Sequence, residues 1–201
     1  MQLIRSTKKL QKEMGLKKSD ISEDEPKELH LGSWHANLIY INRKKCLLFV
    51  NYKTLFNFIV PDISRAQIKE LSNIFRVNLE CVLAAEDVSK KAKRKTMSEY
   101  TSIRYTNTNR KSRLGSMNDL AFHYKYLIQS EGGVQSYAVP SIIKKLNNMP
   151  MGALEYVFPI DALKAVCKKI QHSCNCLRWC FRIDCYPSSI KGISYGHQTK
   201  I

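Results

Sequence analysis

Three successive segments with strand periodicity, joined by very short links, constrain the fold of this 201-residue chain more than any other feature. Residues 34–41 alternate, with Ala36, Leu38 and Tyr40 on one side of the expected strand. Residues 46–50 are continuously apolar, which is typical of a strand buried on both faces, and residues 54–60 follow as a third strand. Links as short as residues 42–45 and 51–53 join antiparallel neighbours, so the sequence predicts an antiparallel meander.

Helical periodicity follows the meander. Ser64 and Gln67 form a capping box, and an apolar stripe from Ile68 to Val82 predicts a helix that covers the meander. Shorter helices are expected over residues 7–14, over residues 139–146 and from Pro159 to about residue 170, and short strands over residues 2–6 and 100–106. The expected fold class is therefore α+β: a small antiparallel β-meander packed with helices and a helix-dominated C-terminal half.

A further helix is expected to begin at Ser116, with Asp119 at its third position, and to end at Gly132. Two interpretations of this helix start remain open. In the first, the free N–H groups of its first turn join Arg110, Lys111 and Arg113 to hold an anion. In the second, Ser116 and Asp119 only cap the helix.

The length predicts one domain, which we place over residues 1–170. Residues 171–201 show no periodicity and carry Cys174, Cys176, Cys180 and Cys185, so we expect an extension outside the fold. The spacing Cys174-x-Cys176 is too tight for a standard zinc knuckle, and neither a metal nor another cofactor is expected. Cys46 and Cys81 stand in apolar surroundings and are expected to be core thiols.

The chain has neither an apolar stretch long enough to span a bilayer nor the apolar core of a signal peptide. We therefore expect a cytoplasmic protein without membrane insertion. The oligomeric state is left open.

The formal net charge of +16 points to an acidic partner, such as nucleic acid, an anionic membrane surface or an acidic protein. The alternative is a lysine-rich surface that only provides solubility. The charge is clustered, with Glu99 the one acid between residues 90 and 113, and Tyr100 and Tyr105 interleave with the cations, a pattern that suits phosphate neutralisation and base stacking. The candidate anion- or nucleic-acid-binding residues are Lys90, Lys91, Lys93, Arg94, Lys95, Arg104, Arg110, Lys111 and Arg113.

A hydrolase is a third interpretation. Ser112, Ser116, His35, His123 and Asp119 supply the residue types of a serine-dependent site, but Gly115-Ser116 is not a Gly-x-Ser-x-Gly nucleophile elbow. No residue is therefore assigned as catalytic, and a non-enzymatic protein is favoured.

Four blocks of the chain resemble a bacterial family of short proteins that share a domain of unknown function. The blocks are Thr-Lys-Lys-Leu at residues 7–10, Trp-His-Ala-Asn-Leu at 34–38, Lys-Ser-Arg-Leu-Gly-Ser-Met-Asn-Asp-Leu at 111–120, and residues 146–159. The resemblance implies a structural signature formed by Gly115, Ser116, Asn118, Asp119 and Trp34. The family pattern has Asn and Arg where this chain has Arg110 and Lys111.

The resemblance implies a bacterial, intracellular protein, and since no activity is known for the family it transfers no catalytic residue. The expected function is thus a non-enzymatic basic module that binds nucleic acid or another polyanion. The alternative is a protein-interaction partner that recognises an acidic protein.

Overall fold

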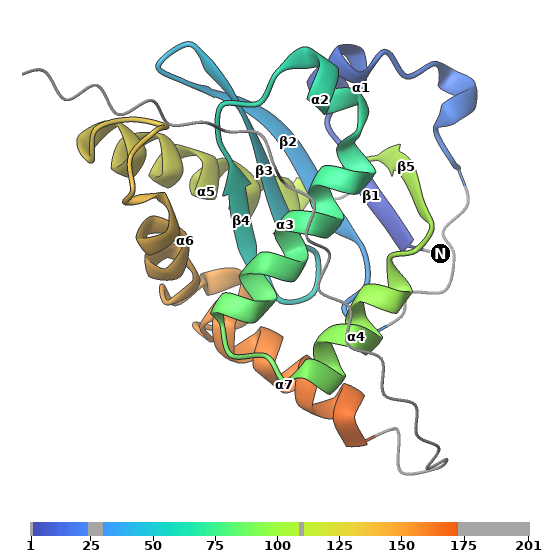
Figure 1. Cartoon of the computed structure of the whole chain (residues 1–201), viewed down its shortest axis with the longest axis vertical. Coiled ribbons are helices and arrows are strands. Elements are labelled where there is room, and N and C mark those ends of the chain that lie inside the picture. The colour runs from blue at the N-terminus through green and yellow to red at the C-terminus, as the bar shows by residue number, and fades with distance from the viewer. Residues whose placement is uncertain (1, 24–29, 109–110, 173–201) are drawn as a thin grey trace, which may run out of the picture.

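The computed structural model describes residues 2–23, 30–108 and 111–172, which form a five-stranded mixed sheet with helices on both faces (Figure 1). This confirms the predicted α+β class. Within those residues no helix is both long enough and apolar enough to span a membrane. The predicted extension at residues 171–201 lies outside the described part of the chain, apart from residues 171 and 172, which end the final helix.

The predicted meander is present. Strands β2 (Trp34–Ile41), β3 (Lys44–Asn51) and β4 (Asn57–Val60) pair antiparallel in chain order. Asn42 and Arg43 form the two-residue β2–β3 turn, and both have positive φ values of 48° and 65°. That conformation matches the right-handed twist of the flanking strands.

The sheet is larger than the meander, because two more strands join it in parallel. Strand β1 (Gln2–Ser6) lies between β2 and β5 (Ile103–Asn107), which gives the order β4-β3-β2-β1-β5. All five residues of β1 are buried, including Gln2 and Arg5. The chain's first strand is thus internal to the sheet.

One face of the sheet carries an aromatic core. Helix α1 (Lys8–Met14) and the short helix η1 (Lys18–Asp20) follow β1, whereas α2 (Arg65–Lys69) and α3 (Leu71–Ala85) follow β4. The buried side chains of α1, α2 and α3 pack on this face. Phe75 of α3 meets Trp34 and Phe49 with ring centroids 5.3 Å apart in both pairs. The predicted cap is confirmed, since Gln67 N donates to Ser64 Oγ at 3.2 Å. The prediction of a single helix is wrong, because the helix is interrupted at Glu70, which separates α2 from α3.

The opposite face carries an aliphatic core under α5 (Lys111–Ser130) and α6 (Val139–Asn147), followed by the short helix η2 (Gly152–Leu154). The prediction that this helix starts at Ser116 is wrong, since α5 begins at Lys111. The apolar stripe also starts earlier, because Leu114, which is partly buried, already packs against this core one turn before Met117. Burial of that stripe outweighs the capping preference of Ser116.

Two more helices close the lower end of the molecule in Figure 1, where α4 (Lys90–Glu99) packs against α7 (Pro159–His172). Cys46 in β3 is buried, as predicted, and Cys167 of α7 is buried as well. Cys81 on α3 is exposed, so its assignment to the core is wrong. It sits on the far side of α3 from the buried residues Leu79 and Leu83.

Candidate polyanion-binding surface

Helix α4 carries the basic run that the sequence suggested, and it buries only small or polar side chains. Ser89 caps it, because its Oγ accepts a hydrogen bond from Ala92 N at 3.2 Å. The buried positions are Ala92, Thr96 and Glu99. This stripe lacks large apolar residues, so hydrophobic periodicity does not reveal the helix, although lysine, alanine and arginine favour one.

The first turn of α4 concentrates positive charge at the end of the helix where the macrodipole is already positive. It contains Lys90, Lys91 and Lys93 and no acid. Lys93 Nζ lies 3.7 Å from Glu80 Oε1 on α3. Cations near a helix N-terminus destabilise the helix slightly, and an anion there relieves the repulsion.

Helix α7 brings further lysines to the same place. Lys90, Lys91, Arg94 and Lys95 line one shallow depression. Lys164 and Lys168 of α7 line a neighbouring depression of about 210 Å³ with the residues around the α4 cap. We call these six cations together the α4–α7 surface, and among the described residues that line the two depressions Asp87 is the one acid.

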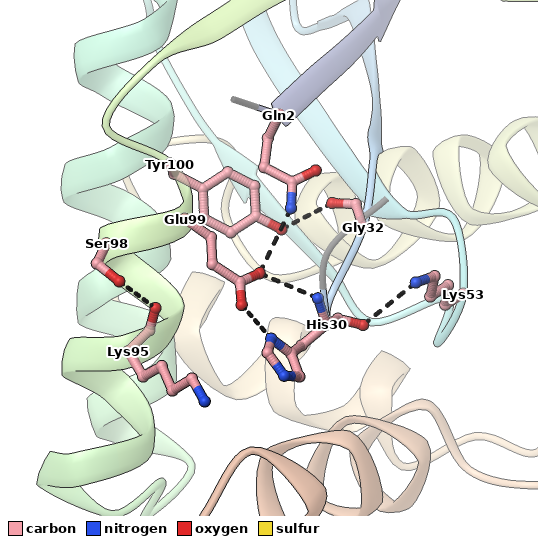
Figure 2. Close-up of polar contacts among 8 residues, drawn as sticks. All are labelled: Gln2, His30, Gly32, Lys53, Lys95, Ser98, Glu99 and Tyr100. Carbon is pink, nitrogen blue, oxygen red and sulfur yellow. Dashed lines mark hydrogen bonds and ion pairs between the residues drawn. The ribbon is translucent and has the colours of Figure 1, made fainter. Parts of the chain in front are cut away.

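The buried side of α4 is fixed by a polar cluster at its C-terminal end (Figure 2). Glu99 is 7% exposed and pairs with the His30 ring through Oε1. Its Oε2 accepts from His30 N at 3.2 Å and from Gln2 Nε2 at 3.4 Å. Through this carboxylate α4 is tied both to β1 and to the segment that leads into β2.

The two tyrosines of the basic run both pack against the core, Tyr100 fully and Tyr105 in part. Tyr100 is fully buried, accepts a hydrogen bond from Trp34 Nε1 at 2.9 Å and donates to Gly32 O at 2.8 Å. Tyr105 is partly buried and its Oη bonds Ser72 Oγ at 2.6 Å. The expected stacking role is therefore wrong for Tyr100, whose ring lies in the core, whereas the Tyr105 ring packs against the core only in part.

The nine cations singled out in the sequence do not form one cluster. Lys90, Lys91, Lys93, Arg94 and Lys95 lie together on α4, whereas Arg104 is exposed on β5, at the far edge of the sheet. Arg110, and the side chains of Lys111 and Arg113 at the start of α5, lie outside what the structure describes. Lys164 and Lys168 were missed, because the sequence does not reveal that α7 packs beside α4.

The signature residues occupy different environments. Trp34 is fully buried, and Ser116 is buried inside α5. Gly115, Asn118 and Asp119 are exposed on the same helix. A Cβ added at Gly115 would meet nothing within 4 Å, so neither space nor a positive φ requires glycine there.

The residue types of the hydrolase interpretation are placed as follows. His35 is buried in β2 with its ring centroid 5.9 Å from that of Tyr52. His123 is half-buried on α5 against Phe122, at 5.9 Å between centroids, and Asp119 is exposed. Arg5 and Ser33 line the same region as His35 and Tyr52, with Arg5 Nε 3.5 Å from Ser33 Oγ and the Arg5 guanidinium 5.9 Å from the Tyr52 ring.

The two buried thiols, Cys167 and Cys46, are expected to be unreactive. Burial, and to a smaller degree the nearby Glu99 carboxylate, raise the pKa of Cys167 to about 11. Burial also raises the pKa of Cys46. A thiol with such a pKa stays protonated at neutral pH and is a poor nucleophile or metal ligand. Within the described residues, no three His, Cys, Asp or Glu side chains converge to hold a metal ion.

These features belong to an α+β domain with a mixed five-stranded sheet and a basic helical end. A family described as a domain of unknown function (DUF6933) matches residues 3–162, and the chain belongs to that family. No curated protein matches the chain.

Proposed function

We propose that this protein is a non-enzymatic basic module that binds nucleic acid or another polyanion through the α4–α7 surface. The observation that carries the proposal is the gathering of six cations from two helices around the N-terminus of α4, with Asp87 as the one acid lining the same depressions. A phosphate chain placed there would lie among these six cations and would face the positive end of the helix dipole.

The surface suits a phosphate backbone better than bases. The side chains that line the two depressions include no aromatic ring within the described part of the chain, and Tyr100 is buried. Lysine and arginine without stacking partners position a backbone and carry little sequence information. We therefore expect similar affinity for single- and double-stranded nucleic acid, and competition by other polyanions.

The experiment is a salt series with the full chain. Fluorescence anisotropy with labelled DNA and RNA of one length, single- and double-stranded, is recorded from 50 to 300 mM salt. The proposal expects micromolar or tighter binding at low salt and a log–log slope of about −3 to −5, because four to six contacts each contribute about −0.7 to −0.9. No binding at 50 mM salt, or binding that is insensitive to salt, would overturn the proposal.

A further inference from the structure

Strand β2 extends well beyond the end of β1, its parallel neighbour in the sheet. Its pairing with β1 covers Trp34, His35 and Ala36. The chain leaves the sheet after Ser6 and enters α1 at Lys8. Within the described residues, β2 therefore has a partner strand only on its β3 side from Asn37 to Ile41.

The open edge directs hydrogen-bonding groups away from the sheet. Thr7 N donates to Ala36 O at 3.1 Å, so the backbone groups of Ala36 point toward the β1 side. Alternate residues of an antiparallel strand point their N–H and C=O groups the same way, so those of Leu38 and Tyr40 point to that side as well. Such an edge is a template for another strand.

A groove of about 570 Å³ follows this edge between α1 and α5. Its lining includes the four consecutive β2 residues 37–40, together with Lys9 of α1 and Phe122 and Lys125 of α5. Side chains of consecutive strand residues point to opposite faces, so a groove that touches all four follows the backbone edge itself. Phe122 is 67% exposed, which is unusual for a phenylalanine, and Lys9 Nζ lies 4.2 Å from the Tyr40 ring centroid.

We propose that this groove binds an acidic segment of a partner protein, which adds to the β2 edge as an extended strand. The β2 edge supplies the main-chain hydrogen bonds, and Phe122 offers an apolar contact for alternate side chains. Lys9 and Lys125 supply the charge complementarity to acidic side chains. Lys9 lies over the Tyr40 ring at the edge of β2, where a lysine also discourages unspecific strand pairing, and on binding it moves to an acidic side chain of the segment.

Charge and geometry favour this occupant over two others. A second copy would bring the same lysines toward one another, and each copy carries a net charge of +16. Nucleic acid has no strand-like row of amide and carbonyl groups to pair with Leu38 and Tyr40. The surface is also separate from the α4–α7 surface, since the groove lies on α1, β2 and α5.

The probe is a capped, fluorescein-labelled seven-residue peptide of alternating glutamate and valine. Two further peptides carry N-methyl groups, one on the odd-numbered amides and the other on the even-numbered amides. Each modification removes the N–H donors along one edge of the extended peptide and leaves its charge and side chains unchanged. The full chain is expected to bind the unmodified peptide and one N-methylated peptide, and to bind the other at least about tenfold more weakly. Equal affinity for all three, or binding to none, would overturn the proposal.

Variants locate the site. Phe122→Ala, and Lys9→Glu combined with Lys125→Glu, are each expected to weaken peptide binding at least about tenfold, whereas Tyr137→Ala, at a side chain that is 100% exposed elsewhere, leaves it unchanged. Slower hydrogen exchange of the Leu38 and Tyr40 amides on peptide binding would support strand addition. If Phe122→Ala weakens the binding of a thymidine oligonucleotide, the occupant of the groove is nucleic acid and not an acidic peptide. If the protein self-associates in a way that depends on Phe122, the occupant is a second copy of the chain.

Discussion

The α4–α7 surface and the groove along β2 are both basic, but they differ in what accompanies the charge. The first gathers six cations from two helices, with no aromatic ring lining its two depressions within the described residues. The second has two lysines, an exposed phenylalanine and an open strand edge. Charge alone attracts any polyanion, whereas directional backbone groups and an apolar contact select an extended chain.

The two surfaces also arise from different features of the fold. The α4–α7 surface depends on a tertiary contact between segments about 70 residues apart, held by the buried side of α4. The groove results from a mismatch of strand length, since β2 has eight residues and β1 has five. We therefore expect substitutions in one surface to weaken binding at that surface and to leave binding at the other unchanged.

The largest effect is expected from removal of charge on the α4–α7 surface. Replacement of Lys90, Lys91, Arg94 and Lys164 by glutamine should weaken nucleic-acid binding about a hundredfold at low salt and reduce the salt slope by about 3, since each cation contributes nearly one unit. Anisotropy across the salt series measures both quantities. The matched control replaces Lys8, Lys9, Lys12 and Lys125, which changes the net charge equally. Equal losses in the two variants would show that only total charge matters.

A smaller effect, on folding, is expected from Glu99→Gln. The change weakens the hydrogen bonds from His30 and Gln2 to a buried carboxylate, so the free energy of unfolding should fall by about 2 kcal/mol. Urea denaturation followed by circular dichroism measures this. Polyanion affinity should be retained where the protein is folded. A change below about 0.5 kcal/mol would mean that the cluster does not hold α4 in place.

Loss of the α4 cap should cost less. In Ser89→Ala the N–H of Ala92 loses its acceptor, which typically lowers the free energy of unfolding by about 1 kcal/mol. Thermal denaturation of the variant beside Ser98→Ala, another exposed serine of the same helix, isolates the cap. Equal melting temperatures for the two variants would contradict the assignment of Ser89 as cap.

The smallest effect is expected from Gly115→Ala, and it should be a gain. Gly115 lies inside α5, and an added Cβ would meet nothing within 4 Å, so alanine should stabilise the helix by roughly 0.5–1 kcal/mol. Polyanion binding and peptide binding should both be unchanged. If the variant is more stable but loses either activity, the signature glycine serves binding rather than folding.

Much of the secondary structure could be predicted from the sequence, because its signals are local. The β2 strand was predicted with its observed bounds, and the Ser64–Gln67 capping box is present. The start of α5 could not be placed, because burial of Leu114 outweighed the capping preference of Ser116. The α4 helix was missed, since its buried residues are Ala92, Thr96 and Glu99.

The candidate surfaces were harder to predict, because they depend on which segments meet. The charge on α4 was visible in the sequence, but the contribution of Lys164 and Lys168 required the packing of α7. Tyr100 was expected beside the cations as a stacking platform, yet it lies in the core. The groove had no sequence signal, because the place where β1 stops beside β2 follows from strand register.

The most direct test is hydrogen–deuterium exchange of the full chain with and without a saturating oligonucleotide, read by mass spectrometry. If the α4–α7 surface binds the oligonucleotide, exchange becomes slower in peptides that span residues 87–95 and 160–168 and changes little in residues 37–41. Slower exchange confined to residues 37–41 and 116–126, or no change anywhere, would contradict the assignment of polyanion binding to the α4–α7 surface.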